Sequence, residues 1–76
     1  MLLPENIHPE NTLMYNGILI VKVLRSTDQH SLIDLYLNAK KENDRLTMGL
    51  FVLSLDWLFL ANCVSLNEHG KVTLCS

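Results

Sequence analysis

The sequence predicts a mainly α-helical protein with a small β-hairpin at its C-terminal end, in the layout of a winged helix-turn-helix. Apolar residues recur at helical spacing in three successive segments. The last segment, "VSLNEHGKVTLCS", is typical of two short strands around a turn in which Gly70 can take a positive φ. Three helices followed by a two-stranded wing are the order of that fold. A plain three-helix bundle with a disordered tail is the main structural alternative.

The chain is short and apolar. It has 76 residues, of which 49% are hydrophobic and 18% charged, and a net charge of -2. We expect a single domain over residues 1–76, with residues 1–11 as an extended lead-in that contains Pro4 and Pro9. A domain of this size buries only about 60% of its unfolded surface. Such a composition indicates either exposed apolar area that binds a partner or simply Leu-rich helices.

The first helix is expected over "LMYNGILIVKVLRS", with Asn11 or Thr12 as its N-cap. The β-branched run 18–23 leaves a strand open as the alternative. Gly17 lowers the stability of a helix unless another element packs closely there. The residues at helical spacing that are expected to face the core are Leu13, Gly17, Ile20, Val21 and Leu24.

Residues that can cap a helix precede the second and third helices. Ser31 opens "SLIDLYLNAKKEN", and Asp34 follows three residues later, as in a capping box. Thr47 precedes the third helix, expected from Met48 to Cys63. The apolar face of the second helix is expected to contain Leu32, Leu35, Tyr36 and Ala39.

The third helix is apolar on two sides. The stripe expected to face the core consists of Met48, Val52, Leu55 and Phe59, flanked by Phe51 and Leu58. The stripe expected to bind a partner consists of Leu50, Leu53, Trp57, Leu60 and Ala61. Trp57 is the best anchor candidate, because aromatic residues dominate interface energetics. The alternative is that the wing and the N-terminal residues Leu2, Leu3 and Ile7 cover this second stripe. The run is shorter than a membrane span of about 20 residues.

The charges argue against direct reading of DNA. The third helix has no Arg, Lys, Asn or Gln before Asn62, and its single charge, Asp56, would repel phosphate. Asp56 is expected to face solvent beside Gly49 or to pair with a cation such as Lys22 or Arg45. The one basic cluster, a candidate for nucleic-acid contact although a solvated face is the ordinary interpretation, is Lys40, Lys41 and Arg45.

Catalytic and metal signatures are absent from the sequence. It has no Gly-rich phosphate loop, no nucleophile elbow and no metal-ligand spacing, so we expect no enzyme activity and no cofactor. The histidines, His8, His30 and His69, are expected to be solvated. Because the N-terminus does not resemble an export signal, Cys63 and Cys75 are expected to be free thiols of a cytoplasmic protein. A disulfide bridge between them stays open.

Four segments together resemble a known family: "LLPENIHPENTLMYNGILIVKVL", "SLIDLY", "FVLSLDWLFL" and "VSLNEHGKVTLC". They are similar to the small middle-component proteins of bacterial ABC-three-component systems. The resemblance implies an SMC-like or Rad50-like ATPase encoded beside the middle protein, and a further effector component, often a nuclease. It also implies defence against phage and plasmids, including Lamassu-type systems. It offers no catalytic residue to carry over.

The leading hypothesis is a non-enzymatic adaptor that binds the ATPase and the effector through the apolar third helix. DNA would then be reached through the complex, and no membrane is involved. The alternative from another class is a winged-helix DNA-binding transcriptional regulator. A small homo-oligomer that buries the stripe against itself is the third possibility.

Overall fold

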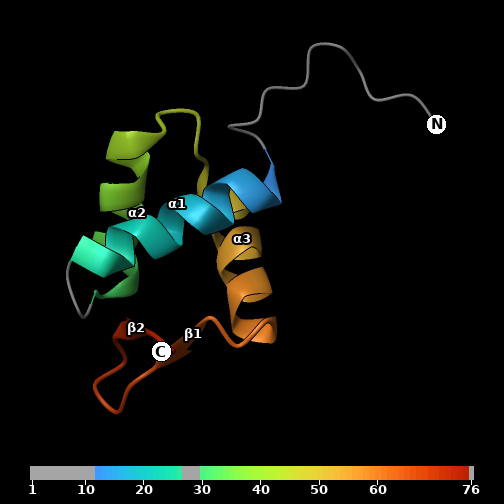
Figure 1. Ribbon diagram of the computed structural model, residues 1–76. Coiled ribbons are helices and arrows are strands. Elements are labelled where there is room, and N and C mark those ends of the chain that lie inside the picture. The colour runs from blue at the N-terminus through green and yellow to red at the C-terminus, as the bar shows by residue number, and fades with distance from the viewer. Residues whose placement is uncertain (1–11, 27–29, 76) are drawn as a thin grey trace.

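The computed structural model describes residues 12–26 and 30–75 of the chain. The expectations for the lead-in 1–11, for His8 and for a cap at Asn11 lie outside these residues. The described elements confirm the predicted order of three helices and a hairpin, and they make the alternative of a strand over 18–23 wrong (Figure 1). They are α1 (Leu13–Ser26), α2 (Leu32–Glu42), α3 (Met48–Leu60), β1 (Val64–Leu66) and β2 (Val72–Leu74).

Polar side chains cap each helix where it begins. The Thr12 hydroxyl accepts a hydrogen bond from the Tyr15 N–H at 3.1 Å. Ser31 and Thr47 accept in the same way from the third residue beyond each of them, at 3.2 Å and 3.1 Å. The caps predicted for α2 and α3 are therefore confirmed, because each hydroxyl pairs an N–H that has no partner within its helix.

The hairpin is a two-stranded antiparallel wing that lies below the three helices in Figure 1. Gly70 takes a φ of 73°, as its turn requires. α3 ends at Leu60, earlier than the predicted Cys63, because Asn62 adopts a left-handed φ of 60° and reverses the chain.

A residue between α1 and α2 extends the wing. His30 and Val72 exchange both backbone hydrogen bonds, at 3.3 Å and 2.7 Å. His30 thereby becomes a single bridge residue on the β2 side of the hairpin, and only 6% of it is exposed. The expectation of a solvated His30 was wrong, because the backbone pairing places its side chain inside. With this bridge added to the helix order, the chain has the layout of a winged helix.

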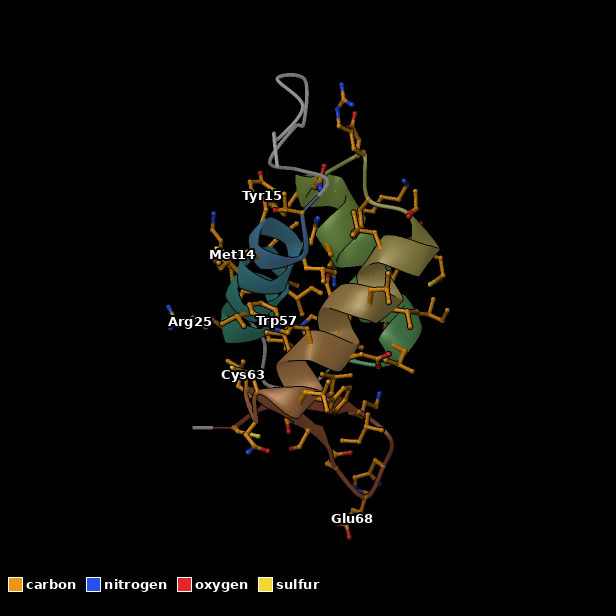
Figure 2. The ribbon with its side chains drawn as sticks, turned by 90° about the vertical axis from the view of Figure 1, so that its right-hand side faces the viewer. Met14, Tyr15, Arg25, Trp57, Cys63 and Glu68 are labelled. Carbon is orange, nitrogen blue, oxygen red and sulfur yellow. The ribbon has the colours of Figure 1, made fainter. Side chains whose placement is uncertain are left out.

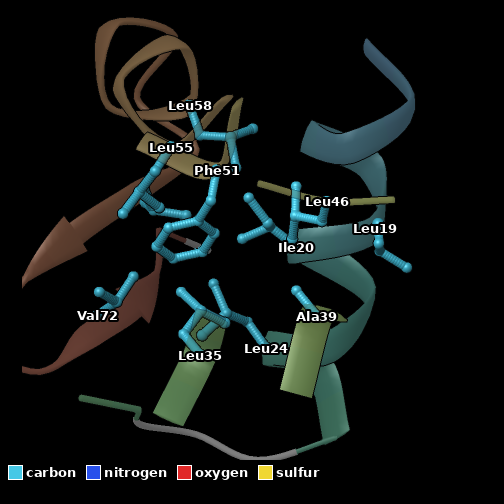
Figure 3. Packing of buried hydrophobic residues seen from close by; sticks show 11 residues of the cluster. Leu19, Ile20, Leu24, Leu35, Ala39, Leu46, Phe51, Leu55, Leu58 and Val72 are labelled. Atoms are coloured by element: carbon cyan, nitrogen blue, oxygen red, sulfur yellow. The ribbon is translucent and has the colours of Figure 1, made fainter. Parts of the chain in front are cut away.

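The hydrophobic core lies where the three helices and the wing meet (Figure 3). Phe51 of α3 is at its centre and meets the Tyr36 ring edge-on, with 5.3 Å between the ring centroids. On α1, Gly17, Ile20 and Leu24 are buried as predicted. The buried hydrophobic residues are Leu19, Ile20, Leu24, Leu35, Ala39, Leu46, Phe51, Leu55, Leu58, Val64 and Val72.

The core-facing side of α3 differs from the prediction. The buried residues of α3 are Phe51, Ser54, Leu55 and Leu58. Met48 and Val52, which were expected in the core, are each 45% exposed, and Phe59 is half-buried. The buried stripe is therefore rotated around the helix axis toward Phe51 and Leu58. Leu13 and Leu32 likewise lie at the surface, at 41% and 46% exposure.

A buried pair of amides fixes α1 against the α2–α3 loop. The side chains of Asn16 and Asn43 are almost completely buried. Asn43 Nδ2 donates to Asn16 Oδ1 at 2.8 Å, and Asn16 Nδ2 donates to the Thr12 carbonyl oxygen at 2.8 Å. Because buried amides require partners, this contact restricts how α1 can sit on the loop.

Candidate protein-binding surface

α3 presents a second apolar side to solvent, which we call the apolar face. Leu60 is 85% exposed, Leu53 59% and Trp57 40%. Ala61 is also exposed, whereas Leu50 is half-buried and packs against the core. The structure therefore leaves four of the five predicted residues at the surface: Leu53, Trp57, Leu60 and Ala61. Among the described residues, α1 covers one side of Trp57, and the rest of these side chains stay exposed.

Trp57 lies across α1 (Figure 2). Its ring is so close to Gly17 that a Cβ atom added there would be 2.7 Å from Cζ3 and 2.9 Å from Cε3. We expected Gly17 to lower the stability of its helix unless another element packs closely there, and α3 does so through Trp57. The close approach holds one side of the indole against α1 and leaves the rest exposed.

The apolar face continues onto α1, which the sequence analysis missed. Met14 and Ile18 are 63% and 62% exposed. Ile18 and Trp57 line the same hollow of about 560 Å³, with Lys22 and Arg25 also lining it. A sequence signal existed, since Met14 and Ile18 are four residues apart, as neighbours on one side of a helix are. This end of the surface is therefore apolar with two cations beside it.

The basic cluster is partly used within the fold. Lys40 Nζ donates to the carbonyl oxygens of Leu46 and Asp44, at 2.7 Å and 3.2 Å, and so braces the loop between α2 and α3. Lys41 and Arg45 are exposed. None of the three lies on α3, whose own residues include no cation. The geometry offers no base-reading side chain on that helix.

Asp56 is exposed and, within the described part of the chain, makes no ion pair. A Cβ atom added at Gly49, seven residues before Asp56 on the same helix, would meet nothing within 4 Å. Of the two arrangements expected for Asp56, the solvent-facing one is observed, and the pairing with Lys22 or Arg45 is not.

The two cysteines are free thiols on facing positions of the wing. The Cys75 N–H donates to the Cys63 carbonyl oxygen at 2.9 Å, which extends the strand pairing by one residue. Across residues 12–26 and 30–75, no cluster of three His, Cys, Asp or Glu side chains could hold a metal ion. In the same residues, every helix is too short or too polar to cross a membrane.

Residues 3–75 match the family described as ABC-three component (ABC-3C) system Middle Component 6. The chain belongs to this family. The resemblance found in the sequence is thus confirmed at the level of an ABC-3C middle component. Comparisons with curated proteins and with solved structures gave no match.

Proposed function

We propose that this ABC-3C middle component is a non-catalytic adaptor whose apolar face binds another component of the same system. The single observation that carries the proposal is the exposure of Leu53, Leu60 and part of Trp57 on α3, whose buried core residues are others. Large apolar patches on small proteins mark interfaces, and an aromatic residue near the patch centre typically supplies much of the binding energy. Leu50 and Ala61 complete the proposed contact.

The partners that we propose are an SMC-like or Rad50-like ATPase and a nuclease-like effector of the same system. The assembly would act in the cytoplasm against phage or plasmids, as in Lamassu-type systems. DNA would be bound by the complex and not by this chain directly. Support for this comes from α3, where a DNA reader would carry cations and this chain carries apolar residues and Asp56.

Binding of the purified chain to the other components of its system tests the proposal. Leu53→Asp places a charge on the apolar face at a position that is not in the core, and should weaken binding roughly thirtyfold or more. Leu37→Asp is the matched control, because Leu37 is 51% exposed on α2 and lies outside the apolar face. Equal binding by the wild type and Leu53→Asp would refute the proposed surface.

The two rival functions give different results. A DNA-binding regulator would bind duplex DNA at low salt, and the binding would weaken when Lys40, Lys41 and Arg45 are neutralised. A homo-oligomer would sediment as a dimer or larger species, and Leu53→Asp would dissociate it. Either result replaces the adaptor proposal.

A further inference from the structure

A second apolar surface lies on the other flank of α3. It is a groove of about 310 Å³ between the beginning of α2, α3 and β1, which we call the α2–α3 groove. Met48 and Val52, the two residues that were wrongly expected in the core, form part of its wall. Its exposed apolar residues are Leu32, Ile33, Met48, Val52 and Leu66, and the half-buried Phe59 also lines it.

The groove has one charged residue, Asp56. Its carboxylate is exposed and, in the part of the chain that the structure describes, has no cationic partner. The hollow beside Trp57 has the opposite charge pattern, because Lys22 and Arg25 line it. The two apolar surfaces thus flank the same helix but select partners of opposite charge.

The chemistry of the groove wall further restricts the kind of molecule that can bind there. Most of the lining residues belong to α2 and α3, in which the backbone N–H groups beyond the first turn are engaged within the helices. An extended peptide would find few main-chain partners on such a wall, whereas a helix satisfies its own backbone. A small metabolite would need several convergent polar groups, and Asp56 alone does not supply them.

We propose that the α2–α3 groove binds an amphipathic helix of another component, one that carries a Lys or Arg beside its apolar anchors. The apolar anchors enter between Ile33 and Val52, and the cation pairs with Asp56. This inference rests on the proposed adaptor role but not on the apolar face, so that the chain has two separate docking surfaces.

Binding of the full-length chain to each of the other purified components of its system tests this inference. Ile33→Asp should weaken the binding of one component at least tenfold, and it leaves the helix intact because an acidic residue suits the first turn of α2. Asp56→Lys should weaken binding of the same component at least tenfold. Glu68→Lys is the matched charge control, since Glu68 is at the exposed tip of the wing and its reversal changes the net charge equally (Figure 2).

The proposals for the apolar face and for the α2–α3 groove can be refuted separately. If Ile33→Asp and Asp56→Lys bind every component as the wild type does, while Leu53→Asp loses one, the groove proposal is overturned and the apolar face stands. If Leu53→Asp binds normally and the two groove variants do not, the groove stands and the proposed apolar face is wrong. If Asp56→Lys binds every component as Glu68→Lys does, the charge of Asp56 does not contribute to binding, and the proposal of a basic helix is overturned.

Oxidative footprinting distinguishes the proposed partner helix from other occupants of the α2–α3 groove. Met48 lies in the groove and Met14 on α1, and both are exposed, at 45% and 63%. We expect both to be oxidised in the isolated chain, and Met48 to be protected in the complex with the groove-binding component. Protection of Met48 in the isolated monomer would mean that residues 1–11 fill the groove, and protection that appears with dimerisation would mean that a second copy does. Both results overturn the proposal.

Discussion

Substitution of Gly17 by alanine tests the packing of Trp57 on α1. Two effects oppose each other. Alanine in place of glycine inside a helix stabilises it by about 0.8–1.0 kcal/mol. The new Cβ would stand 2.7 Å from Trp57 Cζ3, whereas carbon atoms pack at about 3.5–4.0 Å, so the ring must withdraw by roughly 0.8 Å. Such overpacking typically costs about 1–3 kcal/mol.

The expected net result for Gly17→Ala is a loss of about 0–2 kcal/mol in the free energy of unfolding. A chain of 76 residues is expected to have about 4–11 kcal/mol of stability. The variant therefore stays folded, and urea denaturation followed by far-UV circular dichroism can measure the change. The fluorescence of Trp57 should shift, because the ring moves toward solvent.

A double-mutant cycle separates the overpacking cost of Gly17→Ala from its gain in helix propensity. Trp57→Ala alone should cost about 2–3 kcal/mol, since the ring is 40% exposed and full burial would make the loss about 3–5 kcal/mol. In that background Gly17→Ala meets no ring and should stabilise the chain by about 1 kcal/mol. The coupling energy should then equal the overpacking cost of about 1–3 kcal/mol.

The reasoning is refuted if Gly17→Ala has the same effect with and without Trp57. Gly49→Ala is the control, because a Cβ there meets nothing within 4 Å. It should not destabilise the chain in either background.

Two further predictions concern stability and use the same urea measurement. Ser31→Ala and Thr47→Ala should each lower the free energy of unfolding by about 1 kcal/mol, because each removes an N-cap acceptor; a change below a few tenths of a kcal/mol would mean that water replaces the cap without loss. Asn16→Ala should cost about 1–3 kcal/mol, since it removes a buried hydrogen bond with Asn43 at 2.8 Å; wild-type stability in this variant would contradict the bracing role of the amide pair.

The positions of the helices and of the hairpin could be predicted because local signals determine them. Ser31 and Thr47 mark helix starts by side-chain chemistry that acts within one turn. Gly70 marks the hairpin turn in the same way. The bridge at His30 had no such signal, because it depends on a partner more than 40 residues away, Val72. Long-range pairing of a single residue leaves no periodic pattern in the sequence.

The orientation of α3 could not be read from its apolar residues, because they occur on every side. A better signal was the charge. At about 100° per residue, the direction opposite Asp56 falls between Ser54 and Leu58, which are both buried. Ser54 can be buried although it is polar, because its hydroxyl donates to the Leu50 carbonyl oxygen at 2.8 Å and so needs no partner outside the helix. A small polar residue can therefore occupy the buried seam.

The rotation of α3 changes what its apolar residues mean. The core uses Phe51, Leu55 and Leu58, and Leu50, Phe59 and Trp57 pack beside them, so that the fold gains little from large apolar side chains at the remaining, more exposed positions of this helix. Leucine has almost the same helix propensity as glutamine or lysine, and a polar residue at Leu53 or Leu60 would therefore cost the helix little. The sequence nonetheless carries leucine at both, and Met48 and Val52 on the other flank. Stability of the isolated chain does not account for these four residues, whereas the two docking surfaces that we propose would bury them.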